Sequence, residues 1–268
     1  MIVKQQGNFP KGYTAVTEQH GKHNDILLDF GILKMEAGDT EVSAPGRERA
    51  WLLIGGTVTF SWEGKSETVT RRSCFEETPF VLHVSKETEV TISTDSECEL
   101  CVEQCDNETP FPSKLYRQED IRSDIFGGGV LDNTSMRTVR TVFDGEINPD
   151  SNMVMGEVIN HPGKWSSYPP HDHPHPEIYH YRLFPEQGFG ISMLDNDAFV
   201  VKNGDTCLIS PDKTHSQVAG AGYAMYYIWM IPHLPGDKWL PTTRYFRDEH
   251  KWMLKEDVKI WPELKHGK

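Results

Sequence analysis

Short segments of alternating apolar and polar residues dominate the chain from about residue 24 to residue 105. In residues 56–62 the apolar side chains Val58, Phe60 and Trp62 occupy alternate positions, so they share one face of an extended strand. Similar runs follow at close intervals, with turn-forming residues between them and almost no helical periodicity. This pattern predicts an antiparallel β-sandwich or β-barrel.

The composition changes between residues 107 and 136, where Pro110, Pro112 and three glycines at 127–129 interrupt the alternation. The β pattern resumes at residues 137–143 and continues to about residue 230. We therefore expect two β lobes joined by a connection. The predicted division is 1–106 for the N-terminal lobe, 107–136 for the connection and 137–268 for the C-terminal lobe.

Two local signals add detail. The segment from Arg117 to Ile121 fits a single helical turn. Asn203-Gly204, between two β runs, is typical of a two-residue β-hairpin loop.

Forty acidic and 27 basic residues among 268 give a formal net charge of −13, which argues against a nucleic-acid or anionic-membrane partner. The longest apolar run, 224–231, is too short for a membrane span, and the N-terminus has no apolar segment of signal-peptide length. The five cysteines are odd in number and unevenly spaced, which does not indicate a disulfide framework. We expect a cytoplasmic protein.

Three of the cysteines, Cys98, Cys101 and Cys105, are spaced like half of a zinc site. A structural zinc site needs four ligands, and no second pair or nearby histidine follows. The same segment reads as a strand with Cys98, Leu100 and Val102 facing inward, which is the interpretation that we favour.

The histidines indicate where the chemistry lies, because three precede residue 160 and nine follow it. His171, His173, His175 and Glu177 have the same parity, so in an extended chain they project to one face. With a further donor from another strand, for which His215 is the candidate, such a face can hold a divalent cation. Imidazole and carboxylate suit zinc or manganese, with iron, cobalt and nickel as alternatives.

The order of these residues resembles the two metal-binding motifs of the cupin superfamily. Gly163 and His171-x-His173-x3-Glu177 are followed by Gly204-Asp205, Pro211 and His215. The resemblance implies an all-β fold of two tandem cupin (jelly-roll-like) β-barrels, a bicupin. It also implies one divalent metal ion per chain, with the ligands His171, His173, Glu177 and His215.

Further segments resemble the 5-deoxy-glucuronate isomerase family of myo-inositol catabolism, which is related to the 5-keto-4-deoxyuronate isomerases. They are 165–171, 177–179, 185–190 and 248–252. The first lobe matches a cupin framework without a His-x-His motif, and Glu89 stands about where a ligand histidine would be. The first lobe is therefore expected to be a degenerate, metal-free half.

One loop departs from that family. The segment from His173 to Glu177 is short and proline-rich, whereas the family usually has a longer acidic insertion before its glutamate. This loop borders the expected metal, so the substrate can differ. A related branch of the family isomerises sulfoquinovose, and the same scaffold would serve.

The resemblance implies an intramolecular oxidoreductase, an aldose–ketose isomerase, that acts on a small sugar acid or a sulfonated sugar with an anionic C6. The candidates for proton transfer and catalysis are His175, His180, Tyr179, Tyr181 and Arg182, of which His180 and Arg182 have the opposite strand parity. The candidates for substrate binding are Lys164, Lys213, Arg244, His250 and Trp252, chosen because an anionic group calls for a cation and a sugar for an aromatic ring.

Two other classes of protein fit the same ligands. A cupin dioxygenase would depend on molecular oxygen, and a sugar-binding cupin would release its sugar unchanged. By resemblance alone we expect a homo-oligomer, a dimer or higher.

Overall fold

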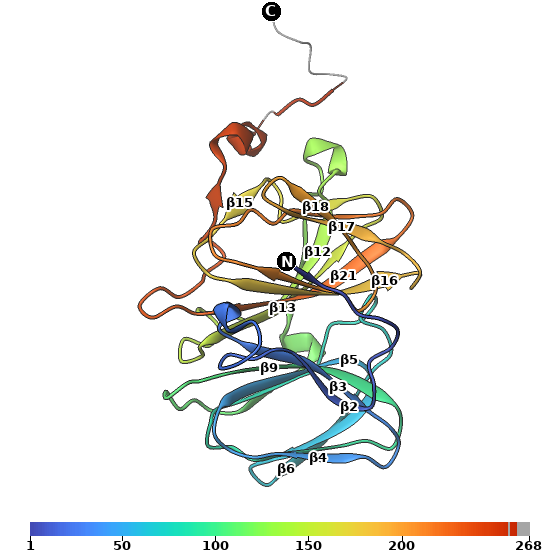
Figure 1. The fold of residues 1–268 in the computed structure, drawn as a ribbon, viewed down its shortest axis with the longest axis vertical. Helices are drawn as coiled ribbons and strands as arrows, with labels where there is room; N and C mark the ends of the chain where they lie inside the picture. The colour runs from blue at the N-terminus through green and yellow to red at the C-terminus, as the bar shows by residue number, and fades with distance from the viewer. Residues whose placement is uncertain (257, 262–268) are drawn as a thin grey trace, which may run out of the picture.

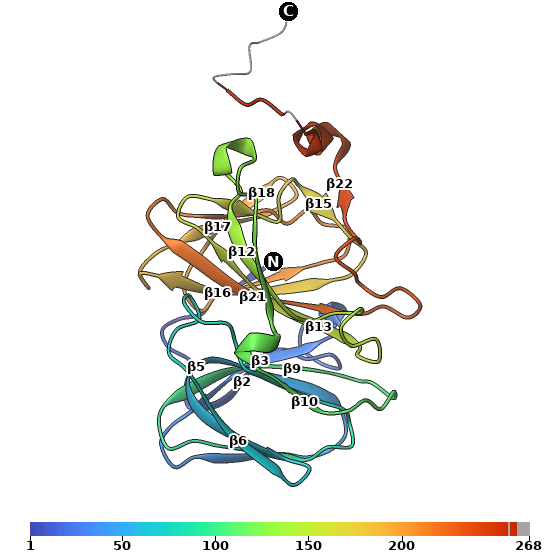
Figure 2. The same cartoon turned by 180° about the vertical axis from the view of Figure 1, so that it is seen from behind.

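The computed structural model describes residues 1–256 and 258–261 as two β lobes stacked along the long axis of the molecule (Figure 1, Figure 2). All the paired strands that it describes are antiparallel. Short 3-10 helices make up the helical content: η1 (Asn24–Ile26), η2 (Gln118–Asp120), η3 (Leu131–Asn133) and η4 (Asp248–Leu254). The helical turn expected near Arg117 is η2.

The first lobe is a single curled sheet of nine strands. They are β2 (Gly12–Thr17), β3 (Asp29–Met35), β4 (Thr40–Ser43), β5 (Glu48–Trp62), β6 (Lys65–Arg71), β7 (Val81–Val84), β8 (Val90–Ser93), β9 (Cys98–Cys105) and β10 (Lys114–Tyr116).

The long strand β5 curls this sheet into a barrel. Its first half pairs with β7 and β9, and its second half pairs with β6 and β8. The register shifts between Leu53 and Gly55, and Gly56 adopts φ +102° with its Cα close to the backbone of β9. A Cβ at Gly56 would lie 2.4 Å from the carbonyl oxygen of Glu97, so the bend requires glycine.

The second lobe has a seven-stranded sheet in the order β1-β19-β16-β21-β13-β12-β11, faced by smaller sheets. The large sheet contains β1 (Ile2–Val3), β11 (Arg122–Phe126), β12 (Arg137–Phe143), β13 (Met153–Asn160), β16 (Glu177–Phe184), β19 (Thr206–Ile209) and β21 (Ala224–Pro232). A four-stranded sheet contains β14 (Trp165–Ser166), β17 (Gly190–Leu194), β18 (Asp197–Val201) and β20 (Gln217–Ala219), and a two-stranded sheet contains β15 (His171–Asp172) and β22 (Tyr245–Phe246).

Alternation along the strands divides the buried residues among three cores. Val58, Phe60 and Trp62 fill the first barrel, as the sequence predicts, together with Leu100 and Val102. A separate cluster fills the second barrel, and a third lies between the lobes. A strand shared by two cores is buried on both faces, so its successive side chains point alternately into one core and the other. Each large apolar side chain buried in this way contributes about 1.5–3 kcal/mol of hydrophobic stabilisation.

The cysteines follow the same rule. Cys98 faces the first barrel, whereas Cys101 and Cys105 face the layer between the lobes. Opposite faces of one strand cannot share an ion, so the interpretation as a strand is confirmed. All five cysteines are buried free thiols.

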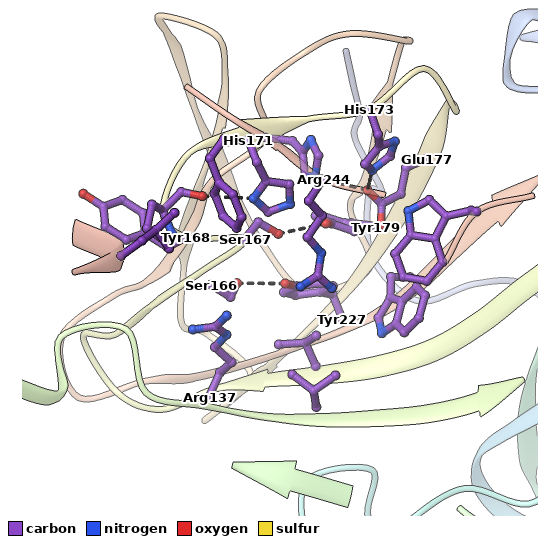
Figure 3. Close-up of a pocket in the computed structure, with 18 residues that line it drawn as sticks. Arg137, Ser166, Ser167, Tyr168, His171, His173, Glu177, Tyr179, Tyr227 and Arg244 are labelled. Atoms are coloured by element: carbon purple, nitrogen blue, oxygen red, sulfur yellow. Dashed lines mark hydrogen bonds and ion pairs between the residues drawn. The ribbon is translucent and has the colours of Figure 1, made fainter. Parts of the chain in front are cut away.

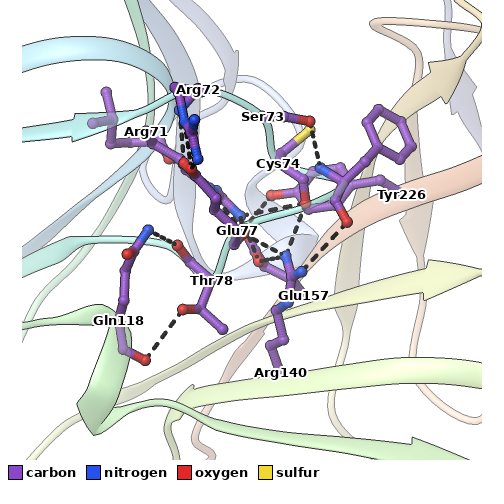
Figure 4. Close-up of polar contacts among 12 residues, drawn as sticks. Arg71, Arg72, Ser73, Cys74, Glu77, Thr78, Gln118, Arg140, Glu157 and Tyr226 are labelled. Atoms are coloured by element: carbon purple, nitrogen blue, oxygen red, sulfur yellow. Dashed lines mark hydrogen bonds and ion pairs between the residues drawn. The ribbon is translucent and has the colours of Figure 1, made fainter.

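A buried ion pair joins the two lobes (Figure 4). Arg71 of β6 donates to Glu157 of β13 at 2.8 and 2.9 Å, and both side chains are fully buried. Arg140 and the hydroxyl of Tyr226 also donate to this carboxylate. Glu157 is thus satisfied from both lobes, which fixes how the second sheet sits on the first.

The boundaries of the two lobes differ from the expected ones at the N-terminus and in the connection. The first strand, β1, pairs with β19 in the second lobe, although residues 1–106 are expected in the first. The expected connection contributes β10 to the first lobe and β11 to the second. The hairpin predicted at Asn203-Gly204 is wrong: a turn forms with Gly204 at φ +83°, but β18 pairs with β17 and β19 pairs with β16, so the turn connects two sheets.

Candidate metal centre

The second barrel encloses a cavity of about 260 Å³ between its sheets (Figure 3). The side chains that line it are Arg137, Val139, Val158, Ser166, Ser167, Tyr168, Pro169, His171, His173, Glu177, Tyr179, His215, Tyr227, Trp229, Trp239, Arg244, Phe246 and Leu254. Cavities for drug-sized ligands measure roughly 300–1,000 Å³, so this one suits a small molecule.

Three of the predicted metal ligands meet in this cavity. The donor atoms of His173, Glu177 and His215 lie within 4.8 Å of one another, and all three residues are buried. It is the only such cluster of histidine, cysteine and acidic side chains among the described residues. Glu177 begins β16, and His215 lies between β19 and β20, so the barrel itself brings together residues 38 positions apart in the chain.

Backbone carbonyls fix the tautomer of each imidazole. The Nδ1 of His173 donates to the carbonyl of His175 at 2.9 Å, and the Nδ1 of His215 donates to the carbonyl of Lys213 at 2.8 Å. In a neutral ring that donates through Nδ1, Nε2 carries a free lone pair. Burial lowers the pKa of His215, which favours this neutral form.

The Oε2 atom of Glu177 shows that this arrangement fits a cation. It lies 3.3 Å from the Nε2 of His173 and 3.3 Å from the Nε2 of His215, is buried, and has no hydrogen-bond partner. Three lone pairs that point at one another in a buried space repel unless a positive charge lies between them. Two imidazoles and a carboxylate are donors suited to a divalent transition metal.

His171 lies beside this cluster and lines the same cavity. Its ring centre is 5.0 Å from that of His215, and its Nδ1 donates to the carbonyl of Pro169 at 2.9 Å, which leaves Nε2 free. Burial, followed by the neighbouring His215, lowers its pKa well below the ordinary value. It belongs to strand β15 and lies outside the tight three-residue group.

The expectation that residues 171–177 form one extended segment is wrong. Strand structure stops after Asp172 and resumes at Glu177, so the parity rule does not apply between them. The fully buried His175 donates from Nε2 to the carbonyl of Asp237 at 2.8 Å and does not line the cavity. Its own carbonyl holds His173, so it supports the cluster through its backbone.

His180 and Arg182 face the other lobe, in keeping with their opposite parity. Arg182 donates to the Nε2 of His180 at 2.6 Å and to Glu99 of the first lobe at 2.6 Å. The Nδ1 of His180 meets the hydroxyl of Thr206 at 3.0 Å, and its ring packs against Phe30. Burial and then Arg182 lower the pKa of His180 well below its ordinary value, and neither side chain lines the cavity.

Tyr179 is the one predicted catalytic residue that lines the cavity, because Tyr181 bonds instead to Gln217 at 2.7 Å. The hydroxyl of Tyr179 pairs with Ser167 at 2.9 Å, and that of Tyr227 pairs with Ser166 at 2.8 Å. Burial raises the pKa of Tyr179 well above its ordinary value and that of Tyr227 to about 12. Both phenols therefore stay protonated and can donate hydrogen bonds.

Of the predicted substrate-binding residues, only Arg244 lines this cavity. The exposed Lys213 forms an ion pair with Asp195 at 2.6 Å. His250 lines a neighbouring cleft with Trp165 and Arg247, while Lys164 and the exposed Trp252 line neither. Lys164 and Lys213 stand close to the motif in the sequence, but their side chains do not line the cavity.

Sequence reasoning missed Arg137 and Tyr227. Arg137 lies on β12 and Tyr227 on β21, and both line the cavity. Figure 3 shows them on the side of the cavity away from His173 and Glu177. The available signal was weak: Arg137 and Val139 alternate on β12, which puts an arginine on a face that otherwise packs a core.

The fold and this centre define a two-barrel cupin with a candidate metal site in its second barrel. A model of the KduI/IolB family matches residues 1–253, and the chain belongs to that family. Among curated relatives, 5-deoxy-glucuronate isomerase of Bacillus licheniformis is 27% identical over 278 residues, which cover 95% of this chain and 98% of that protein. The Geobacillus kaustophilus protein of the same name is 28% identical, covering 86% and 87%.

Solved structures agree on the fold. The crystal structure of an IolB-like protein from Salmonella typhimurium matches with a TM-score of 0.83 at 20% identity, over 95% of this chain and 99% of that one. A cupin 2 conserved barrel domain protein from Leptotrichia buccalis matches with a TM-score of 0.53 at 11% identity, over 87% and 96%. The expected bicupin fold is confirmed, and the chain is an isomerase of the KduI/IolB family.

Proposed function

We propose that this protein is a metal-dependent aldose–ketose isomerase for an open-chain sugar with an anionic group at C6. The first candidate substrate is 5-deoxy-glucuronate, which names the curated relatives, and sulfoquinovose is the alternative. The observation that carries the proposal is the convergence of His173, Glu177 and His215 on one buried point inside a small cavity.

These three residues, with His171 as the proposed fourth ligand, would hold one divalent metal ion. Zinc or manganese is our first choice, and iron, cobalt or nickel would fit the same donors. When bound, the cation supplies Lewis-acid polarisation of the sugar's carbonyl and hydroxyl oxygens.

The phenols of Tyr179 and Tyr227 position the sugar. Each is anchored through a serine, at 2.9 and 2.8 Å, and each keeps its proton because burial raises its pKa. When the serine hydroxyl donates to the phenol oxygen, the phenol proton is free to donate to a sugar oxygen, where negative charge develops as a proton leaves C2. His175 and His180 are not proposed as the base that moves this proton, because neither lines the cavity.

Aromatic side chains line part of the cavity. Trp229, Trp239 and Phe246 form part of its wall, and its volume of about 260 Å³ leaves room for one small substrate. Apolar walls lower the local dielectric constant, which strengthens the polar contacts made beside them.

The test is a proton-NMR time course of metal-loaded protein with 5-deoxy-glucuronate and, in parallel, with sulfoquinovose, under nitrogen and under air. We expect one sugar to be converted to its 2-ketose at the same rate in both atmospheres, and conversion to stop when a chelator removes the metal. Failure of both sugars to react, or a requirement for oxygen, would overturn the proposal and favour the dioxygenase class.

We also propose that the protein works in the cytoplasm as a homo-oligomer. The five free thiols suit a reducing compartment, and no helix in the described part of the chain is long and apolar enough to cross a membrane. Strand β11 is an edge of the large sheet on which Ile125 and Phe126 are exposed, so a second copy has a place to add. Light scattering that shows a clean monomer would contradict the oligomer.

A further inference from the structure

Two arginines share the metal-site cavity without a carboxylate partner. Arg137 and Arg244 both line it, and the described residues place no acidic side chain within ion-pair distance of either. Nearby arginines differ: Arg182 pairs with Glu99 at 2.6 Å, and Arg247 pairs with Asp172 at 3.0 Å. Arg137 is partly buried and Arg244 is exposed. An unpaired guanidinium that lines a cavity is a site for an anion.

The charge balance of the cavity points the same way. Its lining contains two guanidinium groups and one carboxylate, that of Glu177, which belongs to the metal cluster. The cavity is thus positive before any cation binds, and it favours a ligand that brings negative charge.

A backbone carbonyl and an aromatic ring fix the position of the Arg137 side chain. It extends from β12, its Nη1 donates to the carbonyl of Ser135 at 2.8 Å, and its guanidinium lies 5.7 Å from the ring centre of Phe126. Burial, and the positive charge of Arg244 nearby, lower its pKa, so an anion that binds here relieves an existing cost. Figure 3 shows it in the part of the cavity away from His173 and Glu177.

Arg244 reaches the cavity from the C-terminal segment. It directly precedes β22. Strand β22 pairs with β15, where Phe246 lies opposite His171. Its guanidinium lies 5.9 Å from the ring centre of Trp239, and Figure 3 shows it pointing down toward Tyr227. The two arginines therefore reach the cavity from β12 and from the segment before β22.

We infer that Arg137, with Arg244 as its second guanidinium, binds the anionic terminal group of the sugar and makes the protein select charged sugars over neutral aldoses. This inference rests on the proposed function for the identity of the sugar. A carboxylate and a sulfonate both carry a negative charge and present at least two acceptor oxygens to a guanidinium, so the shared ligand is a C6 anion. The end of the sugar that reacts is then directed toward the histidine cluster.

The test is calorimetric binding, which does not depend on turnover. The probes are the alditols made by reducing 5-deoxy-glucuronate and sulfoquinovose at C1, with 5-deoxy-glucitol and glucitol as their neutral counterparts. We expect metal-loaded wild-type protein to bind a charged alditol about 100-fold more tightly than its neutral counterpart. Arg137→Met should remove this preference and leave the weak binding of the neutral alditol unchanged, while Arg137→Lys should keep part of it.

Arg122→Met is the matched control, because Arg122 is exposed on the adjacent strand β11 and pairs with Asp124. It should keep the full preference. Melting temperature and metal content of each variant verify that fold and cluster are intact. The inference is overturned if Arg137→Met retains the preference for charge, or if wild type binds no charged alditol.

The two proposals can fail separately. Arg137-dependent binding of a charged alditol without isomerisation of either sugar would support the anion site and refute the proposed reaction. Isomerisation with an unchanged charge preference in Arg137→Met would support the reaction and refute the anion site. The charged alditol that wild type prefers more strongly over its own neutral counterpart identifies the favoured C6 group, because the two charged probes also differ at C5.

Discussion

The Oε2 atom of Glu177 lies 3.3 Å from the Nε2 atom of His215, and no hydrogen bond joins them. His215 donates a hydrogen bond from Nδ1–H to the carbonyl of Lys213, so its Nε2 carries a lone pair, as does Oε2 of Glu177. The same holds for His173 on the other side of the carboxylate. This relationship, rather than the presence of histidines as such, is the physical argument for a cation.

Removal of one ligand should therefore abolish metal binding. We expect His173→Ala to lower the affinity for the metal by at least about 100-fold, because a buried site loses one donor and leaves Glu177 uncompensated. Isomerase activity should fall with it. Metal content measured by mass spectrometry after dialysis tests this.

His20→Ala is the control, since His20 is exposed in the first lobe and pairs only with Asp106. It should retain full metal content. Full occupancy in purified His173→Ala protein would show that the ligand set is wrong.

Removal of one partner of the buried Arg71–Glu157 ion pair should lower the stability of the protein. Arg71→Met leaves the fully buried Glu157 with one guanidinium instead of two. We expect the free energy of unfolding to fall by about 3–5 kcal/mol, as for other buried pairs that lose a partner. Urea denaturation provides the measurement.

Arg72→Met is the matched control on the next residue. Arg72 is 81% exposed and pairs with Glu77 at the surface, so its loss should cost less than about 1 kcal/mol. Equal effects of the two variants would contradict a special role for the buried pair.

His233 should make stability fall in acid. Its Nδ1 accepts the backbone N–H of Trp239 at 2.9 Å, and burial lowers its pKa from 6.5 to about 4. Between these values the unfolded chain binds a proton that the folded chain does not, so stability decreases as pH falls from 6.5 toward 4.

In His233→Asn, the amide oxygen can accept the same N–H without titrating. The stability of this variant relative to wild type should rise by on the order of 2 kcal/mol between pH 7 and pH 4. Thermal or urea unfolding at several pH values measures the difference. A difference that does not vary with pH would mean that His233 titrates alike in the folded and unfolded chains, so that the fold does not lower its pKa.

Glu103 should lower the stability of the fold as the pH rises above the acidic range. Both of its carboxylate oxygens are buried without a partner, and burial, with Glu48 nearby, raises its pKa well above the ordinary value. The unfolded chain ionises this group above about pH 4.5 while the folded chain keeps it protonated, so stability is lost as pH rises.

Glu103→Met should therefore raise the free energy of unfolding at pH 7 by about 1–3 kcal/mol, and by less at pH 4. Glu97→Gln, at an exposed position beside the same strand, should change it by less than about 0.5 kcal/mol. Destabilisation by Glu103→Met at both pH values would indicate that the carboxyl group has a partner in solution.

The sequence by itself determined the class of fold and the core of the site. Alternation at Val58, Phe60 and Trp62 is a local property, because side chains of a strand alternate wherever the strand goes. The three proposed ligands that converge are His173, Glu177 and His215. The sequence predicted them from the order of motifs in a resemblance to cupins, whose barrel brings such positions together.

Only the tertiary structure decided which neighbours of those ligands face the cavity. His175 is excluded because strand structure breaks between Asp172 and Glu177, and no periodicity rule applies across such a break. The register between strands also puts His180 and Arg182 against the first lobe.

Arg137 and Arg244 are cavity residues that sequence patterns alone could not bring together. Arg137 and Arg244 are 107 positions apart and come from β12 and the segment before β22, so no local pattern links them. Residues that share a cavity across sheets are related by the curvature and pairing of those sheets. That relationship arises from packing of the whole barrel, and it appears only when the chain is folded.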